Sequence, residues 1–177
     1  MIIDAVTELQ DLAIDKHRGA RGEDEALGFK VWGQVSGSMK TWLINYRDLI
    51  NTRLDGVCFI AHDRVHDIEE GGTDQLDPEV GPRLMPSVSS YLCGAVKVIG
   101  YTYIREVKKS KDPLKKDRSV EYRMRLGPHA YYTTKVRRPK SGLTPDSIIN
   151  PTHGKILDIM KGDYEPKKSP IKPKRSQ

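Results

Sequence analysis

The strongest constraint on the fold is a long helical pattern that lies between two short apolar runs. Over residues 31–53 the apolar side chains recur at steps of three and four, the spacing of one helix face. They are Val31, Trp32, Val35, Met39, Trp42, Leu43, Tyr46, Leu49 and Ile50. The run before this helix stops at Asp4, and the run after it, residues 57–61, stops at His62. A strand, a crossover helix and a second strand make a βαβ unit, so the sequence predicts two parallel strands.

The residues that end these two strands are candidates for a ligand site. The carboxyl ends of parallel strands meet at one edge of an open α/β sheet, so Asp4 and His62 are expected at the same edge. There Asp4 can hold Mg²⁺ through water, while His62 senses or polarises a terminal phosphate. The loop G-x-x-x-x-G-K-[ST], whose amides cradle phosphates, occurs nowhere in the 177 residues. Either the sheet belongs to another class, or the phosphate-binding half lies upstream of Met1.

The same pattern predicts how these elements pack. Both strands read as continuous apolar runs, so they are expected to be buried on both faces. Cys58 and Cys93 lie in apolar runs without the spacing of metal ligands, which favours buried free thiols. Both tryptophans are expected in the core. Gly33 and Gly37 lower the helix propensity, and close packing against a neighbour would explain their presence.

The rest of the chain predicts an antiparallel β-meander. The expected elements are a helix or turn over 7–16, loops over 17–28 and 65–82, a helix over 83–92, strands over 96–104, 120–126 and 131–137, a loop over 139–150 and a helix over 153–160. A basic loop at 108–118 joins the first two of these strands, and the turn at 127–130 joins the second to the third. With the parallel pair, this predicts an α/β fold with a mixed sheet.

Composition favours one soluble domain over residues 1–160, followed by a tail. The hydrophobic fraction is 37%, and no apolar stretch has the roughly 20 residues that a membrane span needs. No signal peptide is recognisable, so we expect a cytoplasmic protein without a membrane partner. Of the formal charge of +6, the segment 161–177 contributes +4, from six basic and two acidic residues. A disordered tail is expected, and a nonspecific contact with nucleic acid is compatible with it.

A metal site is a further candidate, in the segment 62–67. Its two His-Asp pairs, four residues apart, could present imidazole and carboxylate ligands on one helical face. The segment follows a strand and runs into a Gly-rich loop, however, and no distant His-Asp set completes the coordination. Solvated loop residues are therefore the favoured interpretation.

The order of these motifs resembles the RecA-like ATP-binding proteins of bacteriophages, P-loop NTPases that include single-strand annealing ATPases. The motifs are Ile-Ile-Asp-Ala-Val-Thr-Glu-Leu at 2–9, Trp-Gly at 32–33 and Val-Cys-Phe-Ile-Ala-His-Asp-Arg at 57–64. The resemblance extends to about Met160 but matches only the carboxyl-terminal portion of the family, starting at the Walker B strand. It implies a RecA-like sheet whose amino-terminal part, with the Walker A lysine, is absent.

The resemblance also implies roles for individual residues. Asp4 resembles the Walker B carboxylate at the Mg²⁺ and ATP site, and Thr7 and Glu8 lie where the family has its hydroxyl and acidic neighbours. His62 corresponds to a polar residue that leads into a DNA-facing loop. The candidate catalytic residues are thus Asp4, Glu8 and His62, although the family's own catalytic glutamate lies upstream of the Walker B strand.

Basic residues supply the other candidate contacts. Lys135 and Arg137 resemble a paired motif that reaches the nucleotide of a neighbouring subunit, and residues two apart on a strand point the same way. Two exposed edge-strand charges are the alternative interpretation. The candidate DNA contacts are Arg64, Lys108, Lys109 and Lys111.

Two functions follow from this reasoning. The first is a phage-encoded, RecA-like ATP-binding protein in the host cytoplasm that acts on DNA, expected to be single-stranded, in recombination or replication as a ring or filament. Without the phosphate-cradling loop, the chain is expected neither to bind ATP tightly nor to hydrolyse it unaided. The rival is a module that holds nucleic acid on its basic β-meander and tail without nucleotide chemistry. Strand tyrosines could stack bases there or simply pack; they are Tyr101, Tyr103, Tyr122, Tyr131 and Tyr132.

Overall fold

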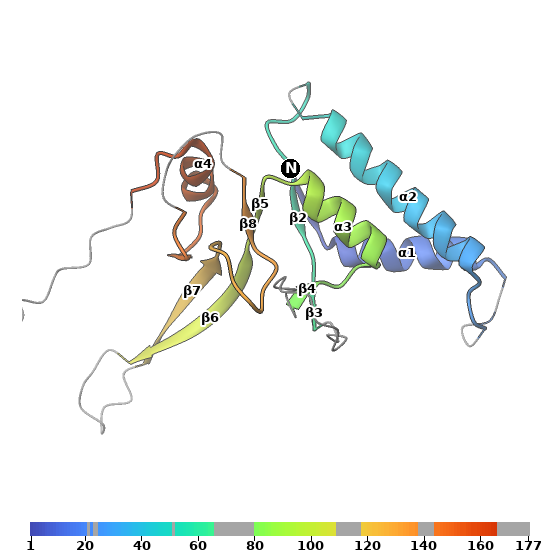
Figure 1. Cartoon of the computed structure of the whole chain (residues 1–177), viewed down its shortest axis with the longest axis horizontal. Coiled ribbons are helices and arrows are strands. Elements are labelled where there is room, and N and C mark those ends of the chain that lie inside the picture. Colours follow the sequence, from blue (N-terminus) through green and yellow to red (C-terminus); the bar gives the residue numbers. More distant parts are fainter. Residues whose placement is uncertain are drawn as a thin grey trace, which may run out of the picture. The chain divides into compact units, whose positions relative to one another are not determined.

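The computed structural model describes residues 1–20, 22, 25–50, 52–65, 80–108, 118–137 and 144–165, without the side chains of Lys108 and Arg118. By its internal contacts, the chain divides into two compact units (Figure 1). The first unit is Met1–Val96 with Ala130–Thr133, and the second unit is Lys97–His129 with Thr134–Gln177. Most of the predicted tail, residues 166–177, lies outside the described residues.

The first unit contains the predicted parallel strand pair. Its elements begin with β1 (Ile2–Asp4), α1 (Val6–Arg18), α2 (Phe29–Asp48) and β2 (Cys58–Ile60). The two strands run parallel, with Ile3 opposite Phe59, so the prediction of a parallel pair is confirmed. The crossover contains two helices, because the segment expected as a helix or turn forms the 13-residue helix α1.

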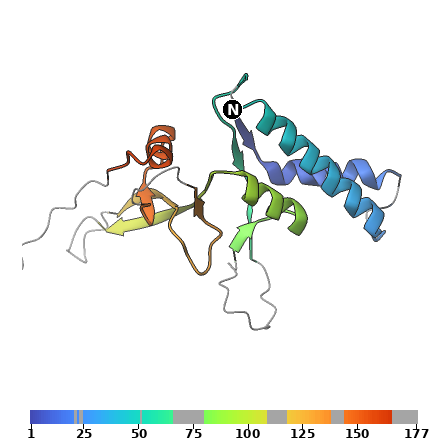
Figure 2. The ribbon, with the colours of Figure 1, turned by 45° about the horizontal axis from the view of Figure 1, so that its top comes forward.

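The helical pattern of α2 forms the core of the first unit. Its buried residues Val31, Val35, Met39 and Leu43 recur every four positions along one face, as the sequence predicts. This face packs against Val6 at the start of α1 and against α3 (Pro86–Ala95), and Figures 1 and 2 show the three helices together. The buried members of the core are Val6, Val31, Val35, Met39, Leu43, Leu84, Val88 and Leu92.

Three packing predictions for this helix and its neighbours are wrong. Trp42 packs against the core, but Trp32 is 36% exposed. No neighbouring element packs closely on Gly33 or Gly37, since a Cβ at either position would meet nothing within 4 Å among the described residues. Cys58 is exposed and Cys93 half-buried, so neither thiol is fully buried.

The strands β1 and β2 are also less buried than expected. Ile2 is 69% exposed, and Cys58 and Ile60 are exposed on β2. The described residues give this sheet only two strands, so it lacks the neighbours that cover the strands of larger parallel sheets. The first unit continues with β3 (Asp63–Val65), which pairs in antiparallel fashion with β4 (Val80–Pro82). Residues 66–79, the middle of the predicted loop, lie outside the described residues.

The second unit contains the antiparallel strands, with a different pairing from the predicted meander. Its elements are β5 (Val98–Ile99), β6 (Tyr101–Lys108), β7 (Arg118–Arg125), β8 (Lys135–Val136), β9 (Ser147–Ile149) and α4 (His153–Lys161). β6 and β7 form the predicted hairpin, whose connection at 109–117 lies outside the described residues. β8, however, pairs with β5 and not with β7. The second neighbour of β7, beside β6, is β9, which forms within the segment expected as a loop.

Gly100 separates two strands where the sequence predicts one. A Cβ at this position would lie 2.7 Å from Cγ of Met124, so a side chain here would have to displace that of Met124. One end of the β6–β7–β9 sheet packs on α4 through the buried residues Leu126, Ile148 and Ile159.

Among the described strands, one parallel pair and three antiparallel groups form four small sheets. The RecA-like class of the fold stays a prediction. In the described part of the chain, no helix combines the length and the apolar character needed to cross a membrane.

Candidate functional site

The candidate site is built where β1 ends and α1 begins. Asp4 is the last residue of β1 and is exposed. After Asp4 the chain enters α1 directly, and Ala5 at the helix start provides no side-chain cap. The positive end of the helix dipole therefore lies beside Asp4, at an edge that suits anionic ligands.

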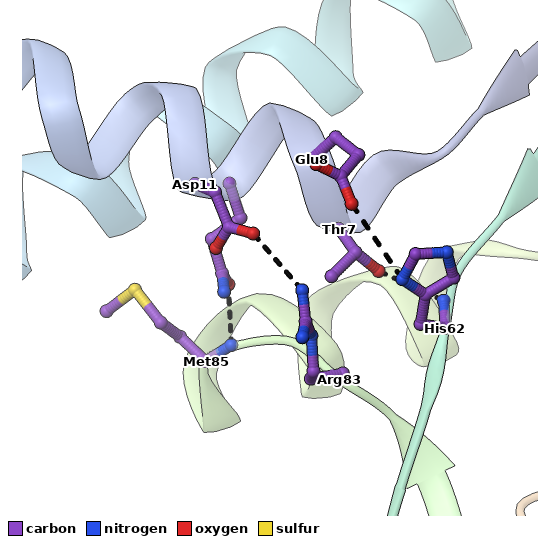
Figure 3. A network of polar contacts seen from close by, with 7 residues as sticks. Thr7, Glu8, Asp11, His62, Arg83 and Met85 are labelled. Carbon is purple, nitrogen blue, oxygen red and sulfur yellow. Dashed lines mark hydrogen bonds and ion pairs between the residues drawn. The ribbon is translucent and has the colours of Figure 1, made fainter.

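A buried hydroxyl ties this edge to the end of β2. The Oγ1 atom of Thr7 accepts a hydrogen bond from the backbone N–H of His62 at 3.0 Å (Figure 3). The Thr7 side chain has no solvent exposure, so the bond is shielded from water. The sequence prediction that Asp4 and His62 lie near one sheet edge agrees with this geometry: Asp4 pairs with Ile60, two residues before His62.

The exposed groups at this edge are an acid and an imidazole. Oε1 of Glu8 lies 3.8 Å from Nδ1 of His62, and both side chains are more than half exposed. An ion pair in this setting contributes little to stability because water screens it. Both groups are accordingly open to a ligand from solvent.

A second pair of contacts, which sequence reasoning missed, anchors the segment before α3 to the same helix (Figure 3). Oε1 of the buried Gln10 accepts a hydrogen bond from the Met85 backbone at 2.6 Å, and Asp11 binds Arg83 at 3.2 Å between Oδ2 and Nη2. Thr7, Gln10 and Asp11 follow the i, i+3, i+4 spacing of one helix face. This stripe of polar residues along one helix face is the sequence signal from which the contacts could be predicted.

Beside Asp4 lies an open hollow of about 460 Å³. Two acidic residues, Asp4 and Glu8, and two aromatic residues, Trp42 and Tyr46, are among those that line it. These two rings meet edge to face at 4.3 Å between centroids. Thus the hollow combines acidic groups for a cation with apolar surface for a flat ring system.

A larger hollow of about 680 Å³ lies beyond the opposite end of α1. Its lining includes His17, Arg18, Lys30 and Gln34. The length of α1, roughly 20 Å, separates it from the Asp4 edge. None of the candidate residues chosen from the sequence lies in this lining.

The donor set at the Asp4 edge fits Mg²⁺ but not a metal held by protein ligands alone. Nowhere in the described parts of the chain do three or more His, Cys, Asp or Glu side chains gather as a metal site. His66 and Asp67, from the candidate metal segment, lie outside those parts. Mg²⁺ is commonly held by one or two carboxylates, waters and phosphate oxygens, and the exposed Asp4 can provide such a carboxylate.

The basic candidate residues belong to other elements than Asp4. Lys135 is half-buried in β8 and Arg137 is exposed just after it; both belong to the second unit, whereas Asp4 belongs to the first. Arg64 is exposed on β3. Lys108 ends β6, and its side chain is not described. Lys109 and Lys111 lie outside the described residues.

Comparison with models of known families, with curated proteins and with solved structures finds no match for this chain.

Proposed function

We propose that this chain is a RecA-like ATP-binding protein that acts on DNA, and that the edge formed by Asp4, Glu8 and His62 faces a magnesium-bound nucleotide. The observation that supports this proposal most is the meeting of these residues at the carboxyl edge of a parallel strand pair. Parallel α/β sheets bind their ligands at this edge.

In this proposal each side chain has a separate task. Asp4 binds Mg²⁺ through water, and the bound ion neutralises charge on the nucleotide phosphates. Glu8 and His62, which lie 3.8 Å apart and are both more than half exposed, face the phosphates. Because Thr7 is buried, it acts by holding the main chain at His62 in place, without touching the nucleotide.

A homo-oligomer, either a ring or a filament, belongs to the same proposal. Lys135 and Arg137 would then meet the nucleotide of a neighbouring subunit. The spacing of two residues supports this role, since alternate residues of an extended segment share a face.

Nucleotide binding tests the proposal on the full chain. We expect weak, magnesium-dependent binding of a fluorescent ATP analogue, measured by anisotropy. Asp4→Asn should lower the affinity at least tenfold, because one charge-assisted contact contributes about 1.5–3 kcal/mol. No hydrolysis is expected, since the 177 residues contain no G-x-x-x-x-G-K-[ST] loop.

The matched control is Asp15→Asn, which removes an exposed carboxylate near the other end of the same helix. It should leave nucleotide affinity unchanged. Equal affinity of the Asp4→Asn variant and the unmodified chain would refute the site. Turnover by the purified chain that disappears in Asp4→Ala would refute the expected lack of hydrolysis.

A further inference from the structure

The basic charge of the chain is concentrated in the second unit. This unit holds 21 of the 30 Lys and Arg residues and 8 of the 24 Asp and Glu residues, which gives a formal charge of +13. The first unit holds the other 9 basic and 16 acidic residues, a formal charge of −7. The net +6 therefore conceals one strongly basic unit, and such units attract nucleic acid through its phosphates.

Within the second unit, one face of the β6–β7–β9 sheet carries aromatic and basic side chains. Side chains alternate between the faces of a strand, and the register places Tyr101 opposite Arg125 and Tyr103 opposite Arg123. We call this surface the Tyr–Arg face; it comprises Tyr101, Tyr103, Arg105, Arg123 and Arg125. The opposite face carries Met124 and Ile148, which pack in the core with Ile159 of α4. The Tyr–Arg face is therefore directed away from that core.

The aromatic rings on this face are already arranged as a platform. Tyr101 and Tyr103 stack with 6.5 Å between centroids and 20° between planes. The guanidinium carbon of Arg125 lies 5.6 Å from the centroid of the Tyr103 ring. Contacts of this kind restrict the rings before a ligand arrives, which lowers the conformational entropy lost on binding.

The face also has an excess of positive charge. Arg105 is exposed, whereas Arg123 is held by Glu121 through hydrogen bonds of 2.7 and 3.0 Å. The bond to Glu121 is the main cause that raises the pKa of Arg123 above its ordinary value, so this side chain stays charged. Three arginines thus stand against one acid on this surface.

We propose that the Tyr–Arg face binds single-stranded DNA, with bases stacked on Tyr101 and Tyr103 and phosphates beside the arginines. Aromatic rings on strands combined with basic side chains bind single strands in this way, whereas a duplex keeps its bases inside the helix. The choice of DNA over RNA rests on the proposed function. The face itself shares no residue with the nucleotide edge.

Binding of a labelled 20-nucleotide oligothymidylate to the full chain, followed by anisotropy without nucleotide, tests this proposal. We expect Tyr103→Leu and Tyr101→Leu each to weaken binding at least fivefold, about the smallest loss seen when one base–aromatic stack is removed. The matched control is Tyr122→Leu, which replaces an exposed tyrosine on the opposite face of the same hairpin. It should leave the affinity within about twofold, while circular dichroism verifies that all three variants are folded.

Photocross-linking provides a test that needs no variant. An oligonucleotide with 5-iodouracil should cross-link to the unmodified chain at Tyr101 or Tyr103. Cross-links confined to other segments, or equal losses in Tyr103→Leu and Tyr122→Leu, would overturn the site. Tighter binding of an oligouridylate or of a duplex of the same length would overturn the assignment to single-stranded DNA. Because no nucleotide is present, these outcomes are independent of the Asp4 site.

Discussion

Thr7 is the residue that links the two strand ends of the first unit. It is fully buried, and its hydroxyl oxygen is the hydrogen-bond acceptor for the backbone N–H of His62. The substitution Thr7→Val preserves the shape of the side chain but leaves that N–H without its partner. We expect the free energy of unfolding to fall by about 1–3 kcal/mol, the usual cost of an unsatisfied buried donor. Urea denaturation followed by tryptophan fluorescence measures this loss, since both tryptophans lie in the first unit.

The control for this prediction is Thr41→Val, at an exposed position of α2. Its effect should stay within about 0.5 kcal/mol, as for most surface substitutions. A similar loss of stability in both variants would show that the Thr7 hydroxyl has no special part in the structure.

At the residue scale, the sequence predicted where Asp4 and His62 lie but not the contacts of Thr7 and Gln10. Placing Asp4 and His62 at strand ends required only the apolar runs before them, so their position at one edge could be predicted. The burial of Thr7 could not, because it depends on contacts between α1 and β2, which are 55 positions apart at Thr7 and His62. The same holds for Gln10, whose partner Met85 is 75 positions away.

At the scale of elements, Gly127 shows how closely β7 and β9 approach each other. A Cβ at this position would lie 2.9 Å from Cα of Asp146, in the segment that leads into β9. Gly127→Ala therefore requires a backbone shift, and we expect it to lower the free energy of unfolding by about 1–3 kcal/mol. Urea denaturation followed by far-ultraviolet circular dichroism measures the change.

Gly33→Ala is the matched control, since it adds the same methyl group inside α2, where nothing lies within 4 Å. Alanine is a better helix former than glycine, so this variant should be more stable by up to about 1 kcal/mol. If Gly127→Ala left stability unchanged or raised it as Gly33→Ala does, the contact between Gly127 and Asp146 would not limit the packing of this sheet.

The elements that follow from local periodicity could be predicted, and those that follow from distant pairing could not. The buried face of α2 was correctly predicted because it repeats within one helix. β9 was missed because three residues of strand give almost no periodic signal, and it forms only by pairing with β7. The short strand β8 was assigned to the wrong neighbour for the same reason, since its pairing with β5 joins distant segments.

At the scale of the whole molecule, the two units carry formal charges of opposite sign. The sequence placed the basic excess in the tail, because residues 161–177 carry +4 of the net +6. The stretch Ala130–Thr133 carries no charge, so the contrast between −7 and +13 follows the chain, with residues 1–96 acidic and residues 97–177 basic. The boundary near residue 96 becomes evident only from the contacts that define the two units. The proposed separation of tasks, with the nucleotide at the first unit and DNA at the second, is compatible with this division of charge.

The central claim is that the Asp4 edge binds a magnesium nucleotide, and paramagnetic broadening of the amide signals of the full chain tests it most directly. With ATP present, Mn²⁺ in place of Mg²⁺ should broaden the amides of Asp4, Thr7, Glu8 and His62 first, and excess Mg²⁺ should restore them. Broadening centred instead on the hollow lined by His17, Arg18 and Lys30, with the Asp4 edge unaffected, would contradict the account.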